Sequence, residues 1–258
     1  MNEWRPPDNH PIDEARARGI VQLTGAPSRE FLGTCCVPLY WWATKQPDNP
    51  ILGNGTVTLI KTPKRVIGLT ANHVVAGALE AFEGGDVVMQ LADASAHELR
   101  TRIIARSANL DLASFSFDGL IDRLGWPDKR PLVSWPPIPP QEGRGIMIGG
   151  YPGNGREKIG RKGISFGLFT ALTIARTVSD DQISCRFERE YMVESADVPA
   201  MPPNYDLGGI SGGPVITLVE SPSYLVSYRL GGIVSEASCE LEKVFAKRVD
   251  FIKDDGSF

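Results

Sequence analysis

The sequence predicts an all-β protein with two Greek-key barrels of six strands each, followed by a short C-terminal helix. The 258 residues include 27 glycines and 20 prolines, which favour many short strands and turns over helices. Two series of short segments rich in Val, Ile, Thr and Phe lie on either side of a proline-dense crossing. Closing each series into a barrel would remove the exposed edges of its sheet.

The strand pattern divides the chain into four parts. Residues 1–30 are polar and contain prolines, and we interpret them as an arm packed on the outside, with a partner-binding tail as the alternative. Residues 31–117 hold the first barrel, and residues 145–258 hold the second barrel and the C-terminal helix. Residues 118–144 include the proline-rich stretch 135–140. Because proline removes hydrogen-bond donors from a sheet, this part is predicted to link the barrels.

The predicted strands are bounded by Gly, Pro, Asn and Asp. The first series comprises Thr34–Trp42, Gly55–Ile60, Val66–Ala71, Val87–Leu91, Leu99–Ala105 and Leu112–Phe117. The second series comprises Gly145–Gly149, Ile164–Ile174, Gln182–Glu188, Val215–Val219, Tyr224–Val234 and Lys243–Lys247. Residues 249–254 are predicted to form the closing helix.

Composition excludes several classes of function. The net charge of −4 provides no basic surface for nucleic acid, and no apolar run reaches the ~18 residues of a membrane-spanning helix. The first residues lack the apolar core of a secretory signal, so we expect a cytoplasmic protein. The four cysteines form no Cys-x-x-Cys pair, which fits a reducing compartment. With three scattered histidines, we expect no metal and no cofactor.

The segment Gly208-Gly209-Ile210-Ser211-Gly212-Gly213-Pro214 is typical of a presented nucleophile. Glycines beside a serine permit positive φ angles and let another molecule approach the hydroxyl closely. With a glycine two residues before the serine, the N–H groups of Gly209 and Ser211 can converge where an oxyanion would develop. The alternative interpretation is a glycine-rich turn before an apolar strand.

A serine hydroxyl needs a base, and the base needs a third group to hold its tautomer. His73 directly follows the apolar run Val66–Asn72 and precedes a short helical pattern, Val74–Leu79, so it lies at a junction. Asp111 is a lone acid inside an apolar strand, where a buried carboxylate requires a partner. Alternatively, His73 is a satisfied core histidine and Asp111 caps a turn. Together with Ser211 they form an ordered His, Asp, Ser set.

Three segments resemble the signature segments of chymotrypsin-like (trypsin-superfamily) serine peptidases of a bacterial, non-secreted type. They are Thr70-Ala71-Asn72-His73-Val74-Val75, Asp111-Leu112-Ala113 and Gly209-Ile210-Ser211-Gly212-Gly213-Pro214. Supporting matches are Gly53-Asn54-Gly55-Thr56-Val57, Ile148-Gly149-Gly150-Tyr151-Pro152-Gly153 and Gly232-Ile233-Val234-Ser235. The resemblance covers about residues 31–254 and implies an active site between the two barrels.

The resemblance implies a serine endopeptidase that acts through an acyl-enzyme intermediate. His73, Asp111 and Ser211 would be the catalytic residues, and the N–H groups of Gly209 and Ser211 would form the oxyanion hole. Ser235 would support Asp111. The backbone of Ser235-Glu236-Ala237 would pair with a peptide substrate as an added strand.

The resemblance also places the floor of a specificity pocket near Tyr205 and Asp206, with Ala237 and Lys243 on its walls. Three alternatives follow. Asp206 could recruit a basic side chain, Lys243 could pair with Asp206 and neutralise it, or Tyr205 could fill the pocket and leave room only for small residues.

An unrestrained endopeptidase inside a cell would attack its host, so we expect either a narrow substrate range or a conformational gate. Residues 197–204 lead into the oxyanion glycines and are the predicted gate. Substrate or a regulatory partner protein would turn the Gly209 N–H toward the oxyanion site. The alternative function is a catalytically silent relative that serves as a protein-binding module. Such relatives usually lack a triad residue or an oxyanion glycine, and this sequence has all of them.

Overall fold

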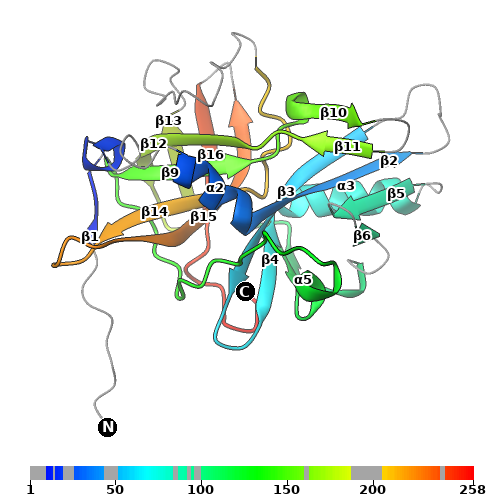
Figure 1. Cartoon of the computed structure of the whole chain (residues 1–258), viewed down its shortest axis with the longest axis horizontal. Helices are drawn as coiled ribbons and strands as arrows, with labels where there is room; N and C mark the ends of the chain where they lie inside the picture. Colours follow the sequence, from blue (N-terminus) through cyan, green and yellow to red (C-terminus); the bar gives the residue numbers. More distant parts are fainter. Residues whose placement is uncertain are drawn as a thin grey trace.

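Strands dominate the computed structural model of the chain (Figure 1). The residues that it describes are 10–13, 15–19, 26–43, 52–83, 87–91, 94–95, 100–159, 163–186, 205–238 and 242–258. In chain order, the first half contains β1 (His10–Pro11), α2 (Ala26–Cys35), β2 (Cys36–Ala43), β3 (Leu52–Lys61), β4 (Val66–Thr70), α3 (Asn72–Glu83), β5 (Val87–Leu91), β6 (Ala94–Ser95), β7 (Ile103–Ser107), β8 (Leu112–Ser116) and α5 (Leu120–Arg123). The second half contains β9 (Gly145–Gly150), η1 (Gly153–Gly155), β10 (Arg156–Ile159), β11 (Gly163–Phe166), β12 (Phe169–Val178), β13 (Gln182–Arg186), β14 (Pro214–Glu220), β15 (Val226–Ser238) and β16 (Lys243–Arg248).

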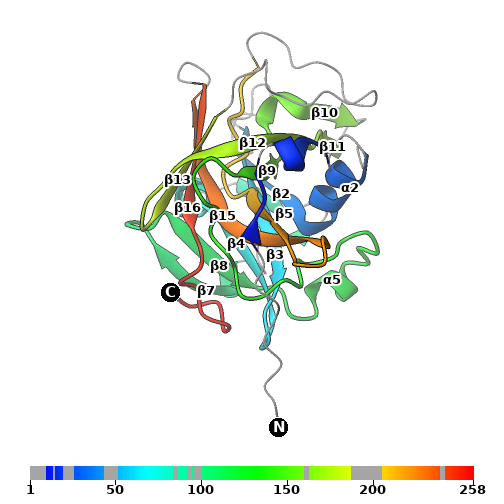
Figure 2. The same cartoon turned by 90° about the vertical axis from the view of Figure 1, so that its left-hand side faces the viewer.

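The second half forms a closed barrel of six antiparallel strands. Its strand order is β14-β15-β16-β13-β12-β9, and β9 pairs with β14 to close the ring (Figure 2). The short strand β1 pairs with the C-terminal end of β14, where His10 lies opposite Glu220. The beginning of the described chain is therefore part of the sheet of the second half.

The first half forms a second antiparallel sheet, in the order β6-β5-β2-β3-β4-β8-β7. Within the described residues, no pairing joins its two edge strands. Helix α3 packs against β2, β3, β5 and β8. The prediction of an all-β, two-barrel fold is confirmed.

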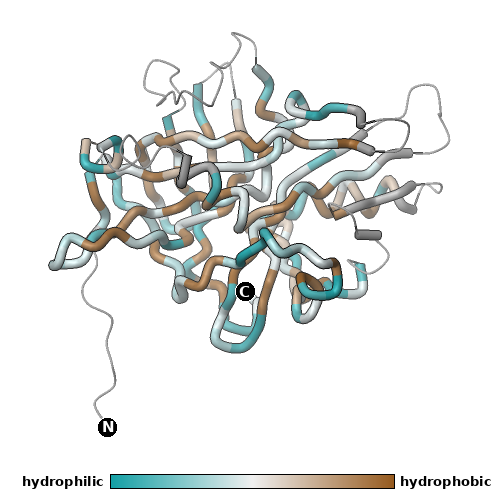
Figure 3. The backbone as a smooth tube through the Cα atoms, in the orientation of Figure 1, coloured by the Kyte–Doolittle hydropathy of each residue, from teal (hydrophilic) through white to brown (hydrophobic). Residues whose placement is uncertain are grey.

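Three hydrophobic cores hold the two halves. One core lies inside the first half, one inside the second, and a third contains apolar side chains from both. In β3, Val57 and Leu59 belong to the core of the first half, whereas Ile60 belongs to the shared core. Successive strand residues face opposite sides, so one side of β3 faces the second half. Figure 3 shows the hydrophobic residues along the strands of both sheets.

Several predicted strands shift at their ends. The predicted strand Ile164–Ile174 divides into β11 and β12, because the Gly167 N–H donates to the Gly155 carbonyl at 2.6 Å and turns the chain there. Strand β7 begins at Ile103 rather than Leu99, and β15 extends to Ser238.

The predicted closing helix at residues 249–254 is wrong. This segment forms turns, while Val249 and Ile252 are buried in the shared core. The segment then returns to the first half, where Ser114 Oγ donates to the Gly256 carbonyl at 2.7 Å and Thr62 Oγ1 donates to the Asp254 carbonyl at 2.5 Å. Side-chain hydroxyls of the first half thus hold the end of this segment.

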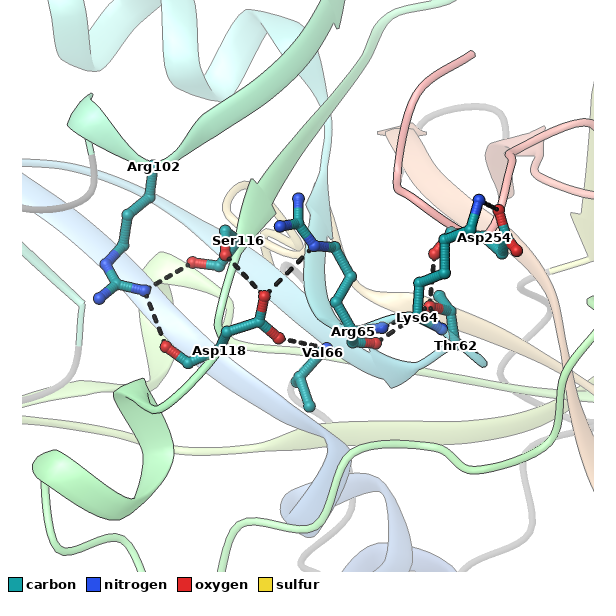
Figure 4. A network of polar contacts seen from close by, with 8 residues as sticks. All are labelled: Thr62, Lys64, Arg65, Val66, Arg102, Ser116, Asp118 and Asp254. Atoms are coloured by element: carbon teal, nitrogen blue, oxygen red, sulfur yellow. Dashed lines mark hydrogen bonds and ion pairs between the residues drawn. The ribbon is translucent and has the colours of Figure 1, made fainter.

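One ion pair reinforces this attachment at the β3–β4 hairpin, and a second joins the hairpin to Asp118, just after β8, within the first half (Figure 4). Lys64 Nζ lies 2.9 Å from Asp254 Oδ1, and Arg65 Nε lies 3.2 Å from Asp118 Oδ2. Asp118 Oδ1 also accepts the Val66 N–H at 2.9 Å. Exposed pairs of this kind add little stability singly, so the buried hydroxyl contacts of Ser114 and Thr62 are the stronger part of the attachment.

The buried cysteines allow a test of this packing. Burial raises the pKa of both Cys36 and Cys185 to about 12, so both stay in the unreactive thiol form at about pH 8. We expect iodoacetamide to leave both unmodified in the native protein and to modify both in guanidinium chloride, as read by peptide mass spectrometry. Native modification of Cys36 at the rate of a free thiol would contradict the packing described here. Cys239 lies outside the described residues.

Candidate active site

His73 lies where a strand passes into a helix, as the sequence predicts. Strand β4 ends at Thr70, α3 begins at Asn72, and the His73 side chain is 52% exposed. The neighbouring Asn72 is buried, and its Oδ1 accepts a hydrogen bond from Arg106 Nε at 3.0 Å. This contact fixes the start of the helix and leaves the imidazole at the surface.

Asp111 contacts His73 twice. Its Oδ2 lies 2.9 Å from His73 Nδ1, and its Oδ1 accepts the backbone N–H of His73, also at 2.9 Å. A carboxylate at a helix N-terminus satisfies one of the unpaired N–H groups of the first turn. With the ring proton on Nδ1, facing the carboxylate, Nε2 is free to act as a base.

The placement of Asp111 inside a strand is wrong. Asp111 lies in a turn immediately before β8, with a φ of 47°, and its N–H donates to the Ala108 carbonyl. The turn lets the carboxylate reach His73 while its side chain stays 23% exposed.

The loop that carries Ser211 requires glycine at two positions. Gly209 has a φ of 103°, and a Cβ there would lie 2.1 Å from Asn54 Nδ2. Gly212 has a φ of 91°, and a Cβ there would lie 1.8 Å from the Thr56 carbonyl oxygen. The loop therefore lies directly against β3 of the first half.

The Ser211 hydroxyl donates to the backbone carbonyl of Ser235 at 3.0 Å, and no hydrogen bond between Ser211 and His73 is present. Ser235 lies at an irregularity of β15, where the register with β16 shifts between Val234 and Glu236. The expected support of Asp111 by Ser235 is wrong, because Ser235 Oγ donates to the carbonyl of Phe245 at 3.2 Å.

Every backbone carbonyl from Gly208 to Gly212 accepts a hydrogen bond. Their donors, in order, are Gly153 N–H at 2.6 Å, Thr56 Oγ1 at 3.1 Å, Gly213 N–H at 2.8 Å, Thr56 N–H at 2.8 Å and Thr58 Oγ1 at 2.8 Å. Buried carbonyls are normally satisfied in this way. The positions of all these peptide planes are thus set by their neighbours.

Two N–H groups of the same loop lack an acceptor within the described part of the chain, those of Gly209 and Ser211. The other N–H groups donate to Asp206 Oδ1, to the Leu207 carbonyl and to the Val234 carbonyl, from Gly208, Ile210 and Gly212 respectively. Both residues are half-buried, so these two N–H groups are available to water or to another acceptor from outside the chain.

A contact at Thr70 brings the histidine and serine segments together. Thr70 Oγ1 donates to the Thr56 carbonyl at 2.6 Å, and a Cβ on Gly212 would lie 2.2 Å from Thr70 Oγ1. Thr70 is three residues before His73, and Gly212 directly follows Ser211. The structure therefore assembles residues from both halves at one place.

The residues expected near the substrate lie as follows. Tyr205 and Ala237 are half-buried against the core of the second half, and burial raises the pKa of Tyr205. Asp206 is exposed, and its Oδ1 accepts the Gly208 N–H at 2.8 Å. Glu236 is exposed, and within the described residues no ion pair joins Lys243 to Asp206. Residues 197–204, the predicted gate, lie outside the described residues.

Sequence reasoning missed the part of β3 that contacts the loop. The alternation Thr56-Val57-Thr58-Leu59 was the available signal, but threonines on one side of a strand usually indicate a solvent-facing side. Here both threonines are fully buried, because the second half covers that side. Asn54 is also next to the loop, and its Nδ2 donates to the Tyr151 carbonyl at 2.8 Å.

A separate cavity of about 350 Å³ is lined by none of these residues. It lies between the N-terminal segment and the β14–β15 hairpin. The Arg16 guanidinium there pairs with Glu220 at 2.8 Å, and the Arg16 N–H donates to Asp13 Oδ1. These charged groups satisfy one another, and we assign the cavity no role in the site.

Neither a membrane-spanning helix nor a metal-binding cluster is found within the described residues. None of the helices there has the length and apolar character needed to cross a membrane. That part of the chain also contains no group of three or more His, Cys, Asp or Glu residues that could hold a metal ion.

Comparison with known proteins supports the architecture. No family model and no curated protein matches the sequence. Among solved structures, the chain is similar to the active form of the Rv3671c protease from M. tuberculosis, with a TM-score of 0.50 and 16% sequence identity. The match covers 96% of this chain and 88% of that one. This likeness supports the all-β, two-barrel fold described above.

Proposed function

We propose that the chain is a serine endopeptidase with His73, Asp111 and Ser211 as its catalytic residues. The observation that carries this proposal is the contact of Asp111 with His73 Nδ1, in a structure that packs the serine loop against the histidine segment. The unpaired N–H groups of Gly209 and Ser211 supply the oxyanion hole that such chemistry requires.

In the proposed reaction, Ser211 Oγ attacks the carbonyl carbon of a peptide bond and its proton passes to His73 Nε2. The carbonyl oxygen becomes an oxyanion that accepts hydrogen bonds from Gly209 and Ser211. His73 then protonates the leaving amine, and water hydrolyses the resulting ester with His73 again as the base. Asp111 stabilises the protonated imidazole throughout.

The resting contact of Ser211 with the Ser235 carbonyl must be exchanged before reaction. The proposed reaction requires a rotation about χ1 of Ser211 that redirects its hydroxyl toward His73. Hydrogen bonds of this kind are often loose in free enzymes and tighten when substrate binds. The backbone of Ser235-Glu236-Ala237 is proposed to bind the substrate as an added strand, with Tyr205 and Asp206 near its side chain.

The competing function is a protein-binding module without activity. One observation favours it, namely that the Ser211 hydroxyl contacts Ser235 rather than His73. Gating by residues 197–204, a regulatory partner protein and a cytoplasmic location stay predictions from the sequence.

Labelling with a fluorophosphonate probe separates the two functions. We expect the wild-type chain to be labelled at Ser211, because attack on phosphorus needs the same base and N–H groups as peptide hydrolysis. The Ser211→Ala chain should not be labelled. Ser114→Ala is a control, since that serine is buried and its hydroxyl contacts Gly256. A native wild-type chain that stays unlabelled would favour the binding module.

A further inference from the structure

The hydroxyl of Thr56 joins the serine loop to the segment that contains Tyr151. Thr56 Oγ1 donates to the Gly209 carbonyl at 3.1 Å and accepts the Tyr151 N–H at 2.9 Å. The same residue donates its backbone N–H to the Ser211 carbonyl at 2.8 Å. Thr56 is fully buried, so the loss of its hydroxyl would leave two backbone groups without a partner.

The contact of Thr56 with Tyr151 matters because residues 151–153 also hold the peptide plane between Gly208 and Gly209. Gly153 N–H donates to the Gly208 carbonyl at 2.6 Å. The C=O and N–H of a trans peptide point to opposite sides, so this bond turns the Gly209 N–H away from Gly153. Asn54 Nδ2 secures the segment through the Tyr151 carbonyl at 2.8 Å. Both peptide planes that meet at the Gly209 Cα are therefore held by contacts that involve Asn54 or Thr56.

From these contacts we propose that Asn54 and Thr56 are positioning residues that fix the direction of the Gly209 N–H for oxyanion binding. Neither residue touches the reacting atoms in this proposal. Thr56 holds the Gly209 carbonyl directly. Thr56 and Asn54 both hold Tyr151, and residues 151–153 in turn hold the Gly208 carbonyl. The inference rests on the proposed peptidase function.

Thr58 provides a matched control on the same strand. It is also a fully buried threonine, and its Oγ1 donates to the Gly212 carbonyl at 2.8 Å. Thr58→Val therefore removes a buried hydroxyl bond to the same loop without touching the carbonyls of Gly208 and Gly209. Thr56→Ser keeps the hydroxyl and removes only the methyl group.

The test measures kcat, KM and inhibitor affinity on the peptide that the wild-type chain cuts fastest from a casein digest. Loss of one oxyanion donor lowers the rate by about 10²- to 10³-fold, and misplacement costs less than complete loss. We expect Thr56→Val to lower kcat by about 10- to 100-fold with KM changed less than about twofold. Asn54→Ala should lower kcat by about 5- to 10-fold, while Thr58→Val and Thr56→Ser should stay within about threefold of wild type.

An inhibitor pair reports on the oxyanion site alone. The aldehyde of the same peptide forms a hemiacetal with Ser211 Oγ, and its oxygen occupies the oxyanion site. The corresponding peptide alcohol binds without that bond. We expect Thr56→Val and Asn54→Ala to weaken aldehyde binding about as much as they lower kcat, and to leave alcohol binding unchanged. Asn54 is only partly buried, so Asn54→Ala serves if Thr56→Val does not fold.

The outcomes separate this inference from the proposed function. Equal losses in Thr56→Val and Thr58→Val, or unchanged aldehyde affinity in both Thr56→Val and Asn54→Ala, would overturn the positioning role while the peptidase proposal stands. A wild-type chain that neither cuts casein nor reacts with the fluorophosphonate would overturn the proposed function and, with it, this inference.

Discussion

Replacing Ser211 or His73 by alanine is expected to lower kcat for peptide hydrolysis by about 10⁶-fold, which is the size of effect that triad removal has in serine peptidases. The two residues act as one unit, because the hydroxyl is a nucleophile only when His73 can take its proton. The double variant should therefore be no slower than either single variant. Steady-state and single-turnover kinetics on the same peptide measure all three.

Asp111→Asn extends this prediction to the third residue. An asparagine cannot stabilise a protonated imidazole and favours the wrong tautomer, so kcat should fall by about 10⁴-fold. Asp118→Asn is the matched control, since Asp118 also accepts a backbone N–H, that of Val66, yet lies in the β3–β4 network of Figure 4. Activity retained within about tenfold in Asp111→Asn would show that this carboxylate does not serve the reaction.

The largest expected effect on stability is that of Gly212→Ala. The substitution forces a Cβ to within 1.8 Å of the Thr56 carbonyl oxygen, at a φ of 91°. Backbone strain and overpacking each cost about 1–3 kcal/mol, so the free energy of unfolding should fall by about 4 kcal/mol. For a chain of this size, that lowers Tm by about 10 °C in calorimetry.

Gly143→Ala is the control for this variant. Gly143 also has a positive φ, 74°, but a Cβ there would meet nothing within 4 Å. It should lose only the strain of the left-handed conformation, about 1–2 kcal/mol. Equal losses in the two variants would show that the contact of the serine loop with Thr56 is not close.

The local pattern of the chain was enough to predict much of this structure. Alternating apolar residues and turn signals predicted two sheets, since burial on one side of a strand leaves a period of two. The position of His73 between a strand and a helix followed from the change of that pattern after Thr70. The glycines around Ser211 indicated close backbone approach, which occurs against β3.

Contacts between distant residues were not readable in the same way. The turn that directs the Asp111 carboxylate toward His73 has no signature in the sequence, because Asp111 and the apolar residues that follow it look like one continuous strand. The alternating threonines Thr56 and Thr58 have the pattern of an exposed strand side, yet both are buried because the second half covers them. Turns replace the helix predicted at residues 249–254, and this segment packs Val249 and Ile252 into the shared core, a contact with distant residues that the local pattern does not show.

The return of residues 254–256 to the first half has a consequence for synthesis on the ribosome. The Ser114 hydroxyl cannot form its hydrogen bond until Gly256, 142 residues further along, has been synthesised. The Thr62 hydroxyl likewise requires Asp254, 192 residues further along. At about 5–20 residues per second, translation needs roughly 7–30 s to cover the shorter of these separations. Strand β8, which directly follows Asp111, can pair with β4 and β7 early, but its buried Ser114 hydroxyl lacks its partner until the end of the second half has emerged. Under the proposed function, a nascent chain that already carries His73 and Asp111 but not yet Ser211 therefore has no assembled site.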